Sequence, residues 1–541
     1  MAVDVLVSDV VVVGAGPVGL MLAGELRLGG ADVVVLDERE GPTTQSRAST
    51  LHARTMEIFE ARGLLGALGT PPCQARGHFG GAPLDLTLPG RFPGQWKVPQ
   101  TRTEQLLGDW AKGLGARLRR RHTVRAVRAG EKGVEVVAAG PGGPVRVRAR
   151  YLAACDGERS TVRRLLGAAF PGQDAGRELL RADVAGLDIA ERRFERLPAG
   201  LAIAARRADG VTRVMVHEFG VRAQPRTGEP EFAEVCQVWK RVTGQDISGG
   251  QPRWVNSFGD ACRLLEHYRH GRVLFAGDAA HQQMPVGGQA LNLGLQDAVN
   301  LGWKLAAVAR GRAPEALLDS YHGERHAVGR RVLDNIRTQA QLLLGGAESA
   351  CLRTLLGELL PKEDVRRHLA AMISGLDVRY DMGAAPATHP LLGARLPYAR
   401  LSSGQKTLDS ADLWRDGRGV LLALGPRAEG LRAVAAPWQG RVTWVAAHCA
   451  DAEEPGPLHG LDALLVRPDG HIAWLRPDQD QSPDQDQGRD QDRDQGRGRD
   501  QGREVALRAA LARWFGSPSA RRPAPPAPSA PLPVTSPAFG E

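Results

Sequence analysis

The stretch that decides the fold is Val10-Val11-Val12-Val13-Gly14-Ala15-Gly16-Pro17-Val18-Gly19. An apolar run ends in three closely spaced glycines, and the helix-like segment 20–28 and a second apolar run at 33–36 follow. Consecutive valines favour a buried strand, and the alternation of strand, tight turn, helix and strand is typical of a βαβ unit. The sequence therefore predicts an α/β protein with a Rossmann-like domain at its start.

Each glycine of this pattern has a separate task in a dinucleotide site. Gly14 permits the tight turn, Gly16 lets a pyrophosphate approach the backbone, and Gly19 lets the helix pack on the strand. The N-terminus of the helix would face the phosphates. Asp37 follows the second strand, where an acid can hold the adenosine ribose. The pattern predicts a dinucleotide cofactor, although by itself it does not separate FAD from NAD.

A second glycine-rich region indicates a flavin. Residues 272–276 form an apolar run that ends in Gly277-Asp278, and residues 284–292 open a long helix that reaches position 309. The Asp278 carboxylate can accept hydrogen bonds from a ribityl chain. The glycine turn can bring backbone N–H groups against a flavin ring, and the positive end of the helix can stabilise an anionic reduced flavin. A strand, turn and helix with a capping aspartate and no cofactor is the alternative.

Composition narrows the class of protein. The chain has 541 residues, 42% hydrophobic and 24% charged, so we expect two to four globular domains. The net charge of +9 could indicate nucleic acid, but the densest arginine run, 117–121, has no interleaved aromatic residues. The six cysteines lack metal-ligand spacing, and no apolar run is long enough to span a membrane. We identify no signal peptide in the sequence. We therefore expect a cytoplasmic protein that binds no nucleic acid, no membrane and no metal.

The pattern along the first 397 residues indicates one domain interrupted by another. Residues 1–171 are predicted to form the first part of the FAD-binding domain, and residues 268–397 its return with long helices. Strand-like pieces within 172–267, separated by Gly, Pro and Arg, predict an inserted β-sheet domain that would hold the substrate.

Residues 398–516 are predicted to form a third unit. Strands are expected at 419–424, 442–447 and 463–466, with a final helix at 504–515. The Asp/Gln/Arg repeats at about 477–503 and the Pro/Ala-rich tail 517–541 carry too few apolar residues to form a core. Both segments are therefore predicted to be disordered.

Four strings of residues together resemble a known family. They are the Gly-Ala-Gly-Pro-Val-Gly turn at 14–19, Cys155-Asp156-Gly157-Glu158-Arg159-Ser160, the Gly-Asp pair at 277–278, and the run from Gly287 to Leu305. The chain resembles the p-hydroxybenzoate hydroxylase-type (group A) FAD-dependent monooxygenases. Within them it is similar to the aromatic polyketide hydroxylases of the angucycline, anthracycline and tetracycline type, which are related to rifampicin monooxygenase. The resemblance covers nearly the whole chain.

This resemblance implies a set of cofactor contacts. Arg47 and Gln100 match FAD contacts, and Val124 falls where a backbone contact to adenine is usual. Asp156 belongs to a motif linked to both FAD and NAD(P)H. Glu38 stands where a basic residue is frequent, a departure expected to weaken an adenosine contact, whereas Asp37 in place of the commoner glutamate is a mild change. The complete set of candidate cofactor-binding residues is Gly14, Gly16, Val18, Gly19, Asp37, Glu38, Arg47, Gln100, Val124, Asp156, Asp278, Pro285, Gly288, Leu291 and Asn292.

Candidate catalytic residues are fewer. His281 and Pro285 lie close to the flavin motif in the sequence, but a histidine at a strand end is equally well a packed, hydrogen-bonded residue. His52, Arg54 and His78 are candidates for lining a substrate or flavin-entry region, and each is more often structural. No residue is identified as a base for a phenol.

The third unit resembles the thioredoxin-like appendix of the polyketide hydroxylase branch. It has no Cys-x-x-Cys pair, so dithiol chemistry is not expected. Asp469, in the string Arg467-Pro468-Asp469-Gly470, is predicted to shape a hairpin turn remote from the flavin.

The resemblance also implies a reaction. NADPH or NADH would reduce FAD, and molecular oxygen would form a C4a-hydroperoxyflavin whose distal oxygen is attacked by a phenolic ring. The implied substrate is a small-molecule polycyclic aromatic polyketide in antibiotic biosynthesis. A Baeyer–Villiger oxygenase on the same fold is the alternative enzyme, and an FAD-retaining partner protein the alternative without activity. The later motifs argue against an NAD-dependent dehydrogenase, while the donor and the choice between monomer and homo-oligomer stay open.

Overall fold

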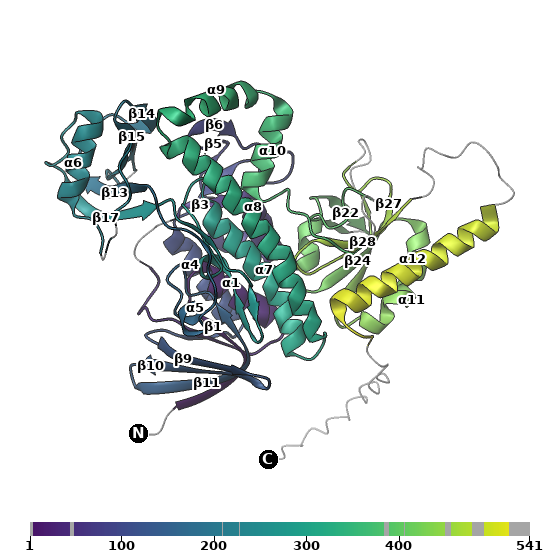
Figure 1. Cartoon of the computed structure of the whole chain (residues 1–541). Coiled ribbons are helices and arrows are strands. Elements are labelled where there is room, and N and C mark those ends of the chain that lie inside the picture. The colour runs from purple at the N-terminus through teal and green to yellow at the C-terminus, as the bar shows by residue number, and fades with distance from the viewer. Residues whose placement is uncertain are drawn as a thin grey trace, which may run out of the picture.

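The computed structural model describes residues 4–43, 48–207, 209–224, 226, 228–383, 389–404, 406–449, 456–478 and 492–518, with the backbone alone for 492–500. Figure 1 shows three sheet-containing regions arranged around the long helices α7 and α8. Among the described residues no helix is long and apolar enough to cross a membrane. All six cysteines are free thiols.

The first 171 residues build most of a largely parallel sheet. Its central strand β1 (Asp4–Val13) pairs in parallel with β2 (Val33–Leu36) on one side and with β11 (Gly143–Ala154) on the other. Val10–Val13 are buried because both faces of the sheet are covered. The sheet order is β19-β20-β11-β1-β2-β8, and the hairpin β9–β10 pairs with β11. The remaining strands of this sheet are β8 (Arg117–Arg119), β9 (Thr123–Gly130), β10 (Gly133–Gly140), β19 (Arg269–His270) and β20 (Val273–Phe275).

Three helices lie close together against this sheet, and small residues permit their approach (Figure 1). They are α1 (Pro17–Leu28), α4 (Gln100–Gly113) and α7 (Gln289–Ala309). A Cβ on Gly24 of α1 would lie 2.0 Å from the Trp110 ring of α4, and a Cβ on Gly302 of α7 would lie 2.3 Å from the Glu25 side chain of α1. Since β1, β2, β11 and β20 run in parallel, their carboxyl ends and the motifs that follow them share one edge of the sheet.

A five-stranded antiparallel sheet spans residues 178–259, inside the segment predicted for an inserted domain. Its order is β14-β15-β16-β13-β17. The helix α6 (Phe232–Thr243) covers one face with the fully buried side chains Val235 and Trp239. The other face packs on Met284 and Val286, just before α7, and on the helix α8 (Asp319–Leu344). The strands are β13 (Glu178–Ala185), β14 (Arg192–Leu197), β15 (Gly200–Arg206), β16 (Thr212–Glu218) and β17 (Gln251–Gly259).

Short elements connect these two sheets. The other helices of this part are α2 (Ala53–Ala61), α3 (Leu65–Leu68), α5 (Thr161–Leu165), α9 (Ala350–Leu359) and α10 (Glu363–Ser374). The short strands are β3 (Thr50–His52), β4 (Cys73–Gln74), β5 (Arg76–Phe79), β6 (Ala82–Asp85), β7 (Gln95–Lys97), β12 (Gly172–Gln173), β18 (Cys262–Leu264) and β21 (His281–Gln282).

The C-terminal unit contains a four-stranded mixed sheet in the order β25-β24-β27-β28. Its strands β24 (Gly419–Ala423), β25 (Val442–Ala446) and β27 (Leu461–Val466) lie where strands were predicted, and β28 (Ile472–Pro477) completes the sheet. The other elements are β22 (Arg400–Ser403), β23 (Lys406–Asp409), β26 (His448–Cys449) and α11 (Leu431–Ala435). The thioredoxin-like assignment of this unit stays a prediction.

The final helix is longer than predicted. The helix α12 spans Asp492–Phe515, so the disorder predicted for 477–503 is wrong at both ends, where Pro477 also belongs to β28. Residues 479–491 and the tail from 519 lie outside the described residues. Leu507, Leu511 and Trp514 are almost completely buried and anchor the helix. Because extending a helix costs less than nucleating one, polar residues can continue it without a core of their own.

Candidate functional site

The glycine loop, by which we mean residues 14–19 between the end of β1 and the first turn of α1, contains two glycines that protein packing requires and one that it does not. Gly14 has φ +101°, and a Cβ on it would lie 2.3 Å from the carbonyl oxygen of Cys155. A Cβ on Gly19 would lie 2.0 Å from the oxygen of Gly14. A Cβ on Gly16 would meet only the Arg39 guanidinium, 4.0 Å away. The space beside Gly16, at the N-terminus of α1, is therefore open to a ligand and fits a pyrophosphate.

The acid after β2 holds this loop in place. Asp37 is 6% exposed, and its carboxylate accepts hydrogen bonds from the backbone N–H groups of Ala15 (2.6 Å) and Arg39 (2.9 Å) and from the Arg120 guanidinium (3.3 Å). Its contact to a ribose stays a prediction. Glu38 is exposed beside it. The family frequently has a basic residue at position 38, and in this chain a basic residue, Arg39, follows one position later. The Asp-Glu-Arg string shows it in the sequence, but Arg39 was not among the predicted site residues.

The structure describes two of the three residues that the resemblance assigns to FAD contacts, Gln100 and Val124. Gln100 begins α4, and its Oε1 accepts from the backbone N–H of Ala48 at 3.2 Å. This bond joins the helix to the segment that follows Arg47, which itself lies outside the described residues. Val124 is a buried residue of β9. The predicted FAD contacts of all three stay predictions.

Asp156 organises the turn after β11. Its carboxylate accepts from the Ser160 hydroxyl (2.6 Å) and from the backbone N–H of Val162 (3.0 Å) at the start of α5. Burial raises the pKa of Asp156, and these hydrogen bonds oppose the rise. The turn packs on the glycine loop, because a Cβ on Gly14 would lie 2.9 Å from the Cα of Asp156. Asp156 thus shapes the edge of the site, and its contacts to FAD and NAD(P)H stay predictions.

The Gly-Asp pair meets the glycine loop directly. A Cβ on Gly277 would lie 3.0 Å from the Val18 side chain, and one on Gly294 of α7 would lie 2.7 Å from the same side chain. Asp278 is exposed between the buried residues Gly277 and Ala279. The fold therefore brings the motifs at 14–19 and 277–294 to one place, with the Asp278 carboxylate at its surface.

The turn before α7 presents backbone to the same region. Gly287 and Gly288 have φ +64° and +70°, the left-handed conformation that favours glycine. The first turn of α7 contains no acidic residue, so the positive end of the helix is not neutralised by its own side chains. Pro285 is exposed and Leu291 half-buried. This arrangement suits a flavin ring, and the individual roles of Pro285, Gly288 and Leu291 stay predictions.

The Asn292 side chain is saturated by the protein. Its Oδ1 accepts from the backbone N–H of His52 (2.9 Å) and the Thr55 hydroxyl (2.7 Å). Its Nδ2 donates to the carbonyl oxygens of Thr50 (3.0 Å) and Gly288 (2.8 Å). A carboxamide has two donor hydrogens and two acceptor lone pairs, so no hydrogen-bonding position is left for a flavin. The Asn292 side chain thus ties α7 to β3 and fixes the glycine turn, and the predicted place of Asn292 near the flavin stays a prediction.

The buried imidazole of His52 lies beside this turn, and the half-buried imidazole of His78 lies near it. His52 donates through Nε2 to the carbonyl oxygen of Gly287 at 2.8 Å, and burial lowers the pKa of His52 to about 4. Burial likewise lowers the pKa of His78 to about 4, with a further contribution from Arg193. Both histidines are therefore neutral at pH 7.

The Lys97 ammonium donates to the Thr50 hydroxyl at 3.0 Å, and burial lowers the pKa of Lys97.

Comparison with known proteins agrees with this geometry. A model of the FAD binding domain matches residues 7–336, and a model of the aromatic-ring hydroxylase C-terminal domain matches residues 389–518. The chain belongs to the FAD-dependent aromatic-ring hydroxylases. It is an FAD-dependent monooxygenase with a mixed α/β fold.

Several relatives are similar along most of their length. A rifampicin monooxygenase of Streptomyces venezuelae is 42% identical over 489 residues, covering 87% of this chain and 96% of that protein. An anhydrotetracycline monooxygenase of Streptomyces rimosus is 41% identical over 486 residues, covering 86% and 95%. The crystal structure of CabE, an aromatic hydroxylase from angucycline biosynthesis, has a TM-score of 0.86 at 47% identity, covering 94% of this chain and 99% of that one.

The hydroxylase buries His281 completely. Its Nε2 lies 2.7 Å from Oδ2 of Asp297, whose other oxygen accepts from Nε of Arg325 at 2.7 Å. Burial acts to raise the pKa of Asp297, but Arg325 and His281 together hold that pKa below its usual range. The Asp297 carboxylate also accepts from the backbone N–H of Gly277 at 3.1 Å. This packing favours the structural alternative for His281, and its catalytic role stays a prediction.

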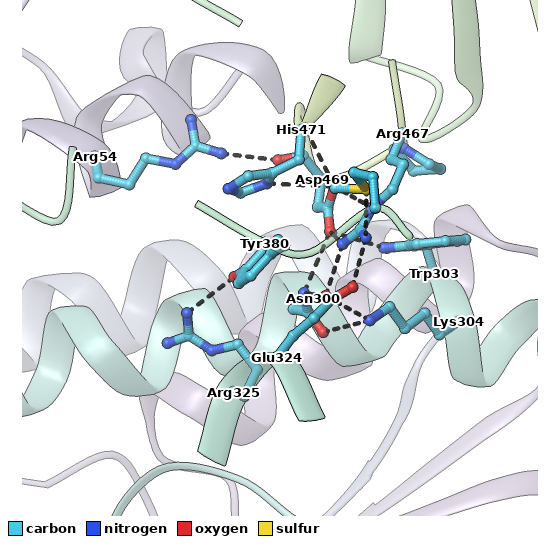
Figure 2. A network of polar contacts seen from close by, with 12 residues as sticks. Arg54, Asn300, Trp303, Lys304, Glu324, Arg325, Tyr380, Arg467, Asp469 and His471 are labelled. Carbon is cyan, nitrogen blue, oxygen red and sulfur yellow. Dashed lines mark hydrogen bonds and ion pairs between the residues drawn. The ribbon is translucent and has the colours of Figure 1, made fainter. Parts of the chain in front are cut away.

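A larger buried network joins the C-terminal unit of the hydroxylase to α7 and α8 (Figure 2). The Arg467 guanidinium donates to both carboxylate oxygens of Glu324, at 2.6 and 2.9 Å, and also pairs with Asp469. Lys304 donates to Glu324 at 2.7 Å, and burial lowers the pKa of Lys304 to about 8. Arg467 and Lys304 oppose the effect of burial on Glu324 and hold its pKa at about 2. The four charges compensate one another.

Asp469 lies in the hairpin turn that was predicted, between β27 and β28, and its distance from the flavin stays a prediction, but its side chain does more than shape the turn. Asp469 is 3% exposed, and its carboxylate accepts from the Trp303 indole of α7 at 3.2 Å. Its backbone oxygen accepts from Arg54 of α2 at 2.8 Å (Figure 2), and a role of Arg54 near the substrate or flavin stays a prediction. The turn does exist, with Gly470 at φ +79°, but it carries a charge into the interface between the units. No local sequence pattern reveals partners more than 150 residues away.

Proposed function

We propose that this hydroxylase uses NADPH or NADH and molecular oxygen to hydroxylate a small polycyclic aromatic polyketide in an antibiotic pathway. Two relatives are named rifampicin monooxygenase and anhydrotetracycline monooxygenase, and CabE is an aromatic hydroxylase from angucycline biosynthesis, which supports this substrate class. The proposal places the reaction in the cytoplasm and needs no nucleic acid, membrane or metal. Among the described residues no cluster of His, Cys, Asp and Glu could hold a metal ion.

The observation that carries the proposal is the convergence of the glycine loop, Asp278 and the α7 turn at one edge of the sheet. Gly16 leaves room for a pyrophosphate, and Asp278 is exposed next to Gly277, which packs on Val18 of the same region. The N-terminus of α7 supplies a positive end for a flavin ring. Bound FAD would supply hydride acceptance from the nicotinamide and activation of oxygen.

The chain itself would orient the cofactor and keep water from it. His52 holds the Gly287 carbonyl group and Asn292 holds the Gly288 carbonyl group, so the turn presents its backbone in a fixed geometry. The neutral His52 adds no positive charge beside this turn. The five-stranded sheet packs on Met284 and Val286, and we assign it the role of a substrate domain that closes this side.

The thioredoxin-like C-terminal unit would have a structural role. Cys449 is exposed and is the cysteine of this unit among the described residues, so the described part offers no dithiol. Its buried contacts to α7 and α8 would instead stabilise the FAD-binding domain.

A substrate panel tests the proposal. Purified FAD-loaded protein would be mixed with NADPH or NADH and with polycyclic phenols, and the products analysed by mass spectrometry under ¹⁸O₂. We expect aromatic substrates to accelerate NAD(P)H oxidation and to gain one labelled oxygen. Products that hydrolyse like esters would favour the Baeyer–Villiger alternative. Oxidation that no aromatic compound stimulates would favour a protein that retains FAD without hydroxylating.

A further inference from the structure

One lysine lies close to the glycine turn before α7 and has no acidic partner. Lys97 of β7 pairs in register with Thr50 of β3, and its ammonium donates to the Thr50 hydroxyl at 3.0 Å. Thr50 packs on the turn, because a Cβ on Gly288 would lie 3.0 Å from the Cβ of Thr50. An ammonium has three donor hydrogens, and Thr50 uses one of them. The half-buried Lys97 therefore keeps two donors that no other described residue accepts.

A second donor lies on the β5–β6 hairpin. The backbone N–H of Gly81 donates to Nδ1 of His78 at 3.3 Å. Because a backbone N–H can only donate, this Nδ1 carries no proton, and neutral His78 carries its proton on Nε2. Burial lowers the pKa of His78, and the nearby charges of Arg193 and Lys97 lower it further. His78 Nε2 is therefore a neutral donor within reach of both charges, and no described residue accepts from it.

Arg193 of β14 is the third member of this group. Its guanidinium donates to the carbonyl oxygen of Gly77 at 3.2 Å, and the ring of the next residue, Phe194, lies 4.2 Å from the His78 ring. Burial lowers the pKa of Lys97, and the charge of Arg193 lowers it further. We call Lys97, His78 and Arg193 the Lys97 cluster. It joins the glycine turn of the FAD-binding domain to the five-stranded sheet, where Figure 1 shows β5 and β6 next to β14.

The Lys97 cluster offers donors and positive charge without a compensating anion. Among the described residues its members hydrogen-bond only to neutral groups, and no carboxylate forms an ion pair with any of them. Taking an ammonium partly out of water costs free energy unless an anion or further acceptors replace the water. An oxygen that carries negative charge would satisfy the free donors and the charge together. An ionised phenol has such an oxygen.

We propose that the Lys97 cluster binds the phenolate oxygen of the aromatic substrate, with Lys97 as its charge partner and His78 Nε2 as a second donor. The cluster lies between the turn assigned to the flavin and the sheet assigned to the substrate, where the ring to be hydroxylated would have to lie. The phenol loses its proton to water, and the cluster stabilises the anion that remains. Ionisation makes the ring richer in electrons, which favours its attack on an electrophilic oxygen. The inference rests on the proposed function for the class of substrate.

The test measures the ionisation of a bound phenol. Alizarin is a dihydroxyanthraquinone whose phenolate absorbs at longer wavelength than its phenol and than the flavin. It is added to the FAD-loaded enzyme without NAD(P)H, and its absorbance is followed against pH. Lys97→Met removes the charge at similar side-chain length, and Lys97→Arg restores it. Lys132→Met, a change at an exposed lysine of the β9–β10 hairpin, is the matched control. FAD titration of each apoprotein measures cofactor binding separately.

We expect wild type, Lys97→Arg and Lys132→Met to bind the phenolate at least roughly ten-fold more tightly than the neutral phenol, because an adjacent positive charge favours the anion. The pKa of the bound probe is then lower than that of the free probe. Lys97→Met should lose this preference and keep its FAD affinity. Equal preference in all four proteins, or no binding by wild type, would overturn the inference. A Lys97→Met variant that loses only FAD affinity would overturn it as well, because the ammonium would then contact the flavin.

The substrate panel is read separately from this titration. Hydroxylation of polycyclic phenols by an enzyme whose Lys97 does not affect probe ionisation refutes the phenolate site alone. A Lys97-dependent preference for the phenolate without hydroxylation of any aromatic compound refutes the proposed function alone.

Discussion

At the scale of single residues, the glycine loop contains glycines that protein packing requires and one that only a ligand would require. Gly14 and Gly19 leave no room for a Cβ against neighbouring backbone. Gly16 has room, and its φ of −75° and ψ of 179° are open to any residue. The sequence pattern predicts all three glycines equally, but only the structure shows that the middle one is not required by packing.

Gly16→Ala should therefore weaken FAD binding by roughly ten-fold or more while changing the free energy of unfolding by less than about 1 kcal/mol. The added methyl group would occupy the space beside the N-terminus of α1, where a pyrophosphate needs close approach. FAD titration and thermal unfolding of the apoprotein measure the two effects. Gly14→Ala is the contrasting variant and should destabilise the apoprotein itself. Unchanged FAD affinity in Gly16→Ala would remove the pyrophosphate from this loop.

Asp278→Ala should lower FAD affinity by roughly ten-fold to a hundred-fold, because a charge-assisted hydrogen bond to ribityl hydroxyls contributes about 1.5–3 kcal/mol. Asp278 is exposed, and thermal unfolding of the apoprotein measures any separate effect of its loss on the fold. Asp469 is no control for it, being buried in the interface. Glu266→Ala, a change at another exposed acid, serves instead. If both variants bind FAD equally, Asp278 is not part of the cofactor site.

At the scale of elements, α7 shows which parts of the site the sequence could predict. The Gly-Gly turn, the helix and its end near 309 follow from local pattern, since each depends on neighbouring residues. The partners of Asn292 do not, because Thr50, His52 and Thr55 lie about 240 residues away in the chain. The surroundings of His281 could not be predicted for the same reason, because they consist of Asp297, and Arg325 behind it, rather than of the strand that precedes His281.

Two imidazoles, of His52 in β3 and His78 in β5, predict acid sensitivity. His52 and His78 have pKa values of about 4 in the fold, against about 6.5 in an unfolded chain. The unfolded chain binds more protons between these values, so their contribution to stability is present above pH 6.5 and lost as pH falls toward 4. Each should cost about 2 kcal/mol between pH 7 and pH 5. Thermal unfolding of the apoprotein should shift downward over this interval.

His78→Phe should reduce this downward shift, since the ring next to Phe194 is kept and the titrating group is removed. His368→Gln changes an exposed histidine and should leave the shift unchanged. The same pH dependence in wild type and His78→Phe would show that His78 does not remain neutral in the fold.

At the scale of the whole molecule, α7 and α8 are shared by all three units. The FAD-binding sheet, the five-stranded sheet and the C-terminal unit all contact one of these helices, which occupy the centre of Figure 1. Strands such as β1, β2, β24 and β27 could be predicted from periodicity, while the division into units stays a prediction. Their connection could not, because it depends on charges that are paired across the interface, such as Arg467 with Glu324. The turn at 467–470, which is polar in the sequence, is therefore buried in the structure.

Asp469→Ala tests this connection. The substitution leaves Arg467 buried with Glu324 as its remaining acidic partner and leaves the Trp303 indole without its acceptor. Removing one partner from a buried ion pair costs about 3–5 kcal/mol, because the other charge stays desolvated. The midpoint of thermal unfolding should fall, and FAD should be lost at the same lower temperature, since α7 carries both the interface and the flavin turn. Asp416→Ala, a change at an exposed acid of the same unit, should leave both midpoints unchanged. The opposite outcome is a C-terminal unit that unfolds independently. Asp469→Ala would then lower the unfolding midpoint of that unit alone, and FAD would be released at the wild-type temperature.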